Sequence, residues 1–226
     1  MNSNLKLWDL VDTPDPKYTK RVNMRGGFTA ISPQYLIKLA TEQFGPYGAG
    51  FGLSESAFDY SLLNEFRIAI HNAKFFYVID GNKHEFVITN TIEVVSKSGH
   101  VDTDYAKKAE TNTLSKALSK IGFAADVYMG MFDDSEYVND VTNEHKIKDA
   151  ADKDLEKARQ ATELLTDFTK VIEQVSTCKS MSELEGLYKS MARRIGNRDA
   201  KMLRKLEAAK DKAKARLNEG DDNETV

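Results

Sequence analysis

The run from residue 65 to residue 96 constrains the fold of this chain more than any other segment. Its two halves, EFRIAIHNAKFFYVI (65–79) and HEFVITNTIEVVS (84–96), alternate between apolar and polar residues, as strands with one buried face do. The letters DGNK separate them, and Asp-Gly between two alternating runs is a strong signal of a β-hairpin. The segment therefore predicts two long antiparallel strands joined by a tight turn.

Helical patterns flank this hairpin. Upstream, ISPQYLIKLATEQFG places a capping residue at Ser32, a proline at the first helical position and a terminating glycine at Gly45. The glycine-rich GAGFGLSESAF that follows alternates enough to form a bent strand. Downstream, residues 103–121 repeat small and apolar residues at helical spacing, and Gly122 ends that pattern. Together the segments predict an α+β fold, in which helices pack on three or four antiparallel strands.

The two ends of the chain have a different texture. The opening WDLVDTPDPKYTKRVNMRGGF has two prolines, a glycine pair and no steady period, so we predict an extended arm or irregular segment. Past residue 150, Lys, Glu, Ala and Leu dominate, and apolar positions recur every three or four residues. The expected segments there are a polar linker at 139–150, helices near 151–176, 181–195 and 198–217, and a disordered acidic tail at 218–226.

The sequence lacks the features of several classes of protein. No apolar run approaches the roughly 18 residues that span a bilayer, and the start MNSNLKLWDLVD lacks the features of a signal peptide. The single cysteine, Cys178, allows no internal disulfide, which fits a reducing cytoplasm. The chain has no P-loop and no G-x-S-x-G motif, and its histidines lack metal-ligand spacing. We therefore expect a cytoplasmic protein that is not an enzyme and needs no metal or cofactor.

Charges are segregated along the chain, although the net charge is only −3. Residues 1–125 hold 14 Lys and Arg against 13 Asp and Glu, and residues 126–145 hold six acids and no Lys or Arg. Residues 189–216 hold 11 Lys and Arg against three acids. This basic segment suits a nucleic acid or a partner protein. A solvated helix face is the commoner explanation of such a segment, but its net charge of +8 exceeds what solubility requires.

Basic residues also occur at two places nearer the N-terminus. In the predicted helix 103–121, Asn112, Lys116 and Lys120 recur every four residues and form one polar stripe, which suits a phosphate backbone or an ordinary solvated face. The arm KYTKRVNMRGG combines cations with a tyrosine, and Tyr47 is the best exposed aromatic for stacking on a base. The candidate DNA contacts are Lys17, Lys20, Arg21, Arg25, Tyr47, Lys107, Lys116 and Lys120.

Three segments in register resemble the Rad52 family. YLIKLATEQFGPYGAGFGL is similar to the family's helix-to-strand segment. KKAETNTLSKALSKIGFAADVYMGMFDDSEYV is similar to its helix pattern A-x-T-x-x-L-x-(K/R)-A-L-x-x-x-G, which an acidic stretch follows. DPKYTKRVNMRGGFTAISPQY resembles the entry to this domain in phage-encoded annealing proteins, so that the resemblance covers about residues 8–138.

The resemblance implies a β-β-β-α core that binds single-stranded DNA, forms rings or helical filaments and anneals complementary strands without ATP in recombination. It implies DNA contacts at Lys116 and at Lys20 or Arg21, while Ser115 and Ser119 stand where the family is commonly basic. By analogy, the C-terminal region contacts an exonuclease or the host single-strand-binding protein. The expected division is an annealing and oligomerisation domain at 1–138, the linker at 139–150, a helical partner or accessory DNA-binding region at 151–217, and the tail.

Two other functions remain open. One is a helical adaptor, in which residues 151–217 carry the function and the sheet domain only oligomerises. The other is a metal-dependent nuclease, although a solvated acidic segment is the simpler interpretation of the residues involved. Its metal ligands would come from Asp126, Asp133, Asp134 and Glu136.

Overall fold

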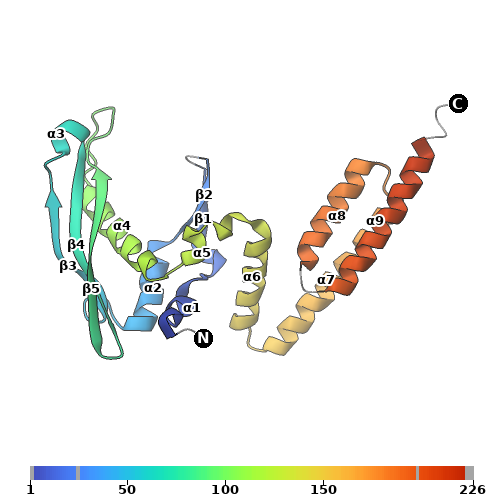
Figure 1. Ribbon diagram of the computed structural model, residues 1–226, viewed down its shortest axis with the longest axis horizontal. Coiled ribbons are helices and arrows are strands. Elements are labelled where there is room, and N and C mark those ends of the chain that lie inside the picture. The colour runs from blue at the N-terminus through green and yellow to red at the C-terminus, as the bar shows by residue number, and fades with distance from the viewer. Residues whose placement is uncertain (1–2, 24–25, 197–198, 222–226) are drawn as a thin grey trace. The chain divides into compact units, whose positions relative to one another are not determined.

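The computed structural model describes residues 3–23, 26–196 and 199–221, and the chain divides into two compact units (Figure 1). Unit 1 is Met1–Asp134 and unit 2 is Ser135–Val226. Unit 1 combines helices with antiparallel sheets, which confirms the predicted α+β class. Its described elements are η1 (Ser3–Leu5), α1 (Trp8–Val11), η2 (Pro16–Tyr18), β1 (Thr19–Val22), β2 (Phe28–Ile31), α2 (Pro33–Phe44), β3 (Phe51–Asp59), α3 (Leu63–Phe66), β4 (Ile68–Ile79), β5 (Asn82–Glu93), α4 (Tyr105–Lys120), α5 (Ala125–Tyr128) and η3 (Met131–Asp133).

An antiparallel sheet in the order β3-β4-β5 forms the framework of unit 1. β4 and β5 pair without a break, and their turn consists of Asp80 and Gly81, which have φ angles of 49° and 76°. Positive φ at both central residues is the mark of a type I′ hairpin turn, so the predicted Asp-Gly hairpin is confirmed. The first strand starts at Ile68 rather than at residue 65 because α3 occupies the preceding residues.

β3 pairs with the other edge of β4 and is bent, as predicted. The register between the two strands shifts between Ser54 and Ala57, and Glu55 within this bulge has a φ of 51°. A bulge adds an unpaired residue to one strand and increases the local twist. The sheet therefore curves at this point.

One face of the sheet carries the core of unit 1. Along β4, Ala69, His71, Ala73 and Phe75 are buried, whereas the residues between them are half-buried. α2 and α4 pack on the strands, with α4 lying across β4 and β5 (Figure 1). The side of α4 that faces the sheet is built from small residues, among which Ala109 and Ala117 are completely buried. The small residues allow the helix and the sheet to approach closely.

The N-terminal segment is not a free arm. α1, η2 and β1 replace the predicted irregular segment, and β1 pairs with β2 in a separate antiparallel sheet. The carbonyl of Val11 accepts a hydrogen bond from the amide of Ala124 at 2.8 Å, and that of Asp12 accepts one from the amide of Asp126 at 3.2 Å. These bonds hold the start of the chain against the segment that follows α4.

Unit 2 is helical throughout its described elements, which are α6 (Ser135–Asp149), α7 (Lys153–Thr177), α8 (Met181–Ile195) and α9 (Ala200–Asp221). The three predicted C-terminal helices are confirmed. The predicted linker at 139–150 is instead helical through Asp149. Because Val141 is the residue that α6 buries, the helix has no wide apolar stripe, and its sequence has the polar texture of a linker. Residues 218–221 of the predicted tail continue α9, and residues 222–226 lie outside the described part of the chain.

The helices α7, α8 and α9 share a hydrophobic core. One cluster contains Phe168, Met191, Ile195 and Leu206, and a second one contains Val175, Leu184, Ala213 and the single cysteine. Cys178 is buried, and its thiol donates to the carbonyl of Val175 at 3.2 Å, so it is a packing residue of this core. No helix in the described ranges is long and apolar enough to cross a membrane.

Candidate nucleic-acid interface

The polar stripe predicted on α4 is exposed. Asn112, Lys116 and Lys120 lie on one side of the helix, while the sheet covers Thr113 and Ala117. The ammonium group of Lys116 donates to the backbone carbonyl of Thr89 at 3.2 Å, which places it beside the edge strand β5. Among the described residues, neither Lys116 nor Lys120 has an acidic partner. The stripe therefore presents uncompensated positive charge along one border of the sheet.

Lys107 does not join this stripe. It precedes Lys116 by nine residues, which is about 2.5 helical turns, so the two lysines lie on opposite sides of α4. The neighbouring Lys108 is paired with Asp102 at 2.7 Å, and this carboxylate raises the pKa of Lys108. The beginning of α4 therefore adds one exposed cation that has no ion pair among the described residues, Lys107, at a separate position.

The basic residues of the N-terminal segment are divided between two faces of β1. Arg21 is held by the Asp133 carboxylate, which also accepts from the hydroxyl of Thr29 at 2.8 Å. Lys17 is paired with Asp15 at 2.5 Å. Lys20 is exposed and points to the face of β1 opposite Arg21, because successive side chains of a strand alternate. Arg25 lies outside the described residues.

Phe28 is a further candidate contact that sequence reasoning missed. It lies opposite Val22 in the β1–β2 pair, and Val22 is two residues from Lys20, so Phe28 and Lys20 share a face. The Phe28 side chain is 45% exposed. A cation and an aromatic ring on one exposed face suit a single strand, whose bases stack while its phosphates bind the cation. The signal in the sequence is an aromatic residue directly after the glycine pair of a basic hairpin.

Tyr47 is exposed, as predicted, whereas the aromatics beside it are buried. Its side chain is 45% exposed and meets the ring of Phe51 edge-on, with 5.4 Å between the ring centroids. Phe51 and Phe44 belong to the core of unit 1. The described interactions do not join Tyr47 to Lys116 or to the basic residues of β1.

Two of the four acidic residues considered for a metal site, Asp126 and Asp133, are engaged by other side chains. Asp126 is buried and accepts a hydrogen bond from the hydroxyl of Thr13 at 2.5 Å. Asp133 is engaged by Arg21 and Thr29. In the part of the chain that the structure describes, no three His, Cys, Asp or Glu side chains gather as metal ligands would. Asp126 and Asp133 therefore tie the N-terminal segment to the chain that follows α4.

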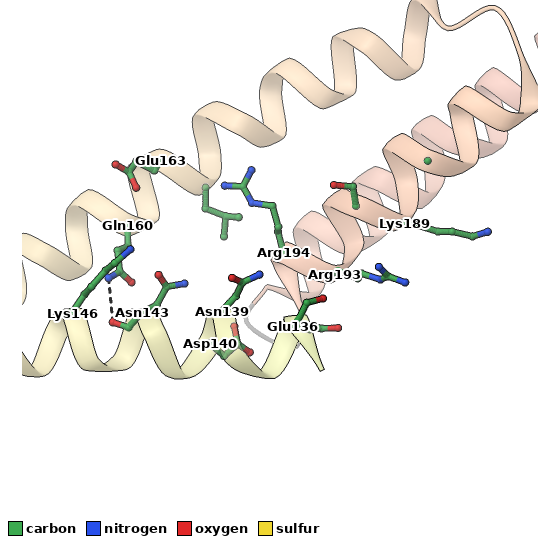
Figure 2. A pocket seen from close by; sticks show the side chains of 14 residues that line it. Glu136, Asn139, Asp140, Asn143, Lys146, Gln160, Glu163, Lys189, Arg193 and Arg194 are labelled. Carbon is green, nitrogen blue, oxygen red and sulfur yellow. Dashed lines mark hydrogen bonds between the residues drawn. The ribbon is translucent and has the colours of Figure 1, made fainter. Parts of the chain in front are cut away.

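Unit 2 contains an open polar pocket of about 710 Å³ between α6, α7 and α8 (Figure 2). The side-chain amide of Gln160 donates to the carbonyl of Asn143 at 3.2 Å across the gap between α6 and α7. Arg194 on the wall is paired with Asp167 at 2.7 Å. The other charged residues of the wall have both signs, so the pocket favours neither an anion nor a cation. These residues are Glu136, Asp140, Lys146, Glu163, Lys189 and Arg193.

Comparison with known proteins leaves the chain without an assigned relative. No family model matches it, and no curated protein sequence matches it. The functional argument therefore depends on the motifs in the sequence and on the geometry of these residues.

Proposed function

We propose that this protein is an ATP-independent single-strand annealing protein of the Rad52 type, which binds single-stranded DNA along its backbone through unit 1. The observation that supports this most directly is the stripe of Lys116 and Lys120, which is exposed and has no acidic partner within the described structure. It borders a unit in which β3, β4 and β5 are followed by the packed helix α4, the order of the β-β-β-α core that the resemblance implies.

The mechanism is electrostatic. Lysines that bind phosphates release condensed counterions, and the affinity for DNA falls as salt rises. Phosphate contacts carry no sequence information, so the bases remain free to pair with a complementary strand. Lys20 and Phe28 provide a second point of contact at which a base can stack beside a bound phosphate. Tyr47, Lys17 and Lys107 remain candidate contacts of the same kind.

Assembly and partners form part of the same proposal. The protein forms a homo-oligomer that aligns many copies along one strand, and it acts in the cytoplasm, where unit 2 contacts an exonuclease or a single-strand-binding protein. Light scattering after size-exclusion chromatography measures the oligomer. A strictly monomeric protein in the presence and absence of DNA would contradict it.

The function is tested by mixing two complementary labelled oligonucleotides with the protein, without ATP, and following duplex formation. The expected result is annealing well above the rate without protein. A rate equal to that background excludes the proposed function.

The site is tested with the double variant Lys116→Gln and Lys120→Gln. Because each lost phosphate contact on a single strand lowers the slope of log affinity against log salt by about 0.7, the double variant should lower it by about 1.4. The matched control is Lys38→Gln, since Lys38 is exposed on α2 and paired with Glu42 at 3.7 Å. An unchanged slope in the double variant would remove α4 from the interface, even if the protein anneals DNA.

A further inference from the structure

The outer face of α9 carries a row of lysines. Leu206 and Ala213 bury the inner face of the helix against its neighbours, with 0% and 4% of their surface exposed. Lys201, Lys205 and Lys212 are exposed and are spaced by four and seven residues, which places them along one side of the helix. At 1.5 Å per residue, the row extends over about 16 Å.

Two other cations of α9, Lys210 and Arg216, are engaged by neighbouring groups. Lys210 lies 4.2 Å from the centre of the Tyr188 ring and 3.9 Å from Asp211. Arg216 donates to the carbonyl of Cys178 at 2.6 Å. In contrast, the side chains of Lys201, Lys205 and Lys212 make no ion pair or hydrogen bond within the described residues, and the same is true of the adjacent Arg204.

The row also differs from several exposed lysines on the neighbouring helices. On α7 Lys157 is paired with Asp154, and on α8 Lys189 is paired with Glu185. On α9, the nearest acid in sequence to the row, Asp211, lies beside Lys210. Like charges on one helix face repel one another, so the row costs stability unless an external anion binds to it.

The anion is more consistent with a nucleic acid than with an acidic protein segment. Protein and peptide partners usually anchor large apolar or aromatic side chains in a recognition surface. Among the described residues of unit 2, the large apolar side chains that are well exposed, Leu155 and Leu165, lie on α7. On the lysine face of α9, the exposed position that lies between Lys205 and Lys212 at helical spacing is Ala208. A phosphate backbone needs no such anchor, because counterion release supplies the binding free energy.

We propose that Lys201, Lys205 and Lys212, with Arg204 beside them, form a second binding surface for a nucleic-acid backbone on unit 2. This inference rests on the proposed function in one respect, because it takes single-stranded DNA as the polyanion that binds to the surface. Each protein chain then binds DNA at two places, so that one copy can hold two strands or two segments of one strand. The absence of an aromatic side chain in the row means that this surface binds phosphates without stacking on bases.

The test uses the full chain with Lys201, Lys205 and Lys212 all changed to Gln. The matched control changes Lys157, Lys170 and Lys189 to Gln, which removes the same charge from exposed lysines that are already paired. Fluorescence anisotropy with labelled oligo(dT) is measured over a range of salt concentrations. The α9 variant should bind severalfold more weakly, with a salt slope lower by about 2, while the control keeps the wild-type slope.

Two results would overturn the inference. An equal loss of affinity for oligo(dT) in the α9 variant and in the control would show a general effect of protein charge. Unchanged binding of oligo(dT) by the α9 variant, together with lost binding of labelled poly-glutamate, would show that the row serves an acidic protein partner. The double variant Lys116→Gln and Lys120→Gln separates the two proposals. If this double variant no longer anneals DNA while the α9 variant binds oligo(dT) as the wild type does, the proposed function alone is supported. A weakened α9 variant of a protein that does not anneal supports the α9 surface alone.

Discussion

Gly122 lies directly against the indole ring of Trp8. A Cβ atom built on Gly122 would stand 2.8 Å from Cδ2 of Trp8, closer than side-chain carbons approach one another, and the glycine has a φ of 102°. Gly122, just past the end of α4, thus has two roles. Its positive φ turns the chain, and its missing side chain leaves room for Trp8 of α1. This contact joins the start of the segment that resembles the Rad52 family to the end of its helix α4.

Gly122→Ala is expected to destabilise unit 1 by about 2–4 kcal/mol, because it adds overpacking against Trp8 to the cost of a positive φ. Trp8 is the only tryptophan of the chain, so its fluorescence during urea unfolding reports on unit 1. The control is Gly186→Ala in α8, where an added Cβ meets no atom within 4 Å. A Gly122→Ala protein with the wild-type urea midpoint would contradict this role for the contact.

The sheet and α4 are joined by a buried histidine. His71 on β4 has its Nδ1 atom 2.8 Å from the hydroxyl of Thr113 on α4, and its Nε2 atom 2.7 Å from the hydroxyl of Ser56 on β3. Burial lowers the pKa of His71, although nearby Glu110 acts in the opposite direction. The native state therefore favours the neutral ring, which satisfies both hydroxyl groups.

We expect unit 1 to lose stability as the pH falls below about 6.5, the ordinary histidine pKa. With the pKa lowered in the folded state, the unfolded chain binds the proton first, so the free energy of unfolding decreases until the pH passes the folded-state value. One such group contributes a slope of at most about 1.4 kcal/mol per pH unit. This slope is measured by urea unfolding followed by Trp8 fluorescence. The pH range runs from about 7.5 to about 5, which brackets the ordinary histidine pKa of about 6.5.

His71→Gln should reduce the pH-dependent part of the stability, while His84→Gln should retain it, because His84 is exposed on β5. If the two variants have the same pH dependence as the wild type, another group is responsible. The overall stability of His71→Gln should also fall, since glutamine does not reproduce both hydrogen bonds at their distances.

The pair of Arg21 and Asp133 gives a third prediction. Asp133→Asn should strengthen binding of oligo(dT) severalfold, because Arg21 then loses its carboxylate partner and can bind a phosphate. Both side chains are partly exposed, at 52% and 38%, so the free energy of unfolding should change by no more than about 1 kcal/mol. The control is Glu42→Gln, which frees Lys38 on α2 instead. Equal or weaker DNA binding by Asp133→Asn would place Arg21 outside the interface.

Local patterns were sufficient for much of the fold. The Asp-Gly turn specifies its own hairpin because both residues tolerate the positive φ that the turn requires. The helix beginning at Pro33 and ending before Gly45 was recognisable because its boundaries depend on residues next to one another in the chain. α6 was missed because its few buried residues leave a weak helical period.

The candidate site was less predictable, because most of it depends on pairing between distant residues. Spacing alone identified the exposed stripe of Lys116 and Lys120. It could not show that Asp133 binds Arg21, which is 112 residues away, or that Phe28 shares a face with Lys20. The basic segment near the C-terminus was evident as composition, yet which of its lysines lack partners became visible only with the helices in place.

The sequence by itself determined the hairpin, the small-residue face of α4, the C-terminal helices and the segregation of charge, since each follows from neighbours within a few turns or strands. Only the tertiary structure decided which charges remain available. It buried Asp126 beside Thr13, paired Arg21 and left Lys116 and the α9 lysines exposed. The physical reason is that an ion pair or a buried hydrogen bond forms wherever folding brings two groups within about 3–4 Å, and that distance is unrelated to their separation along the chain.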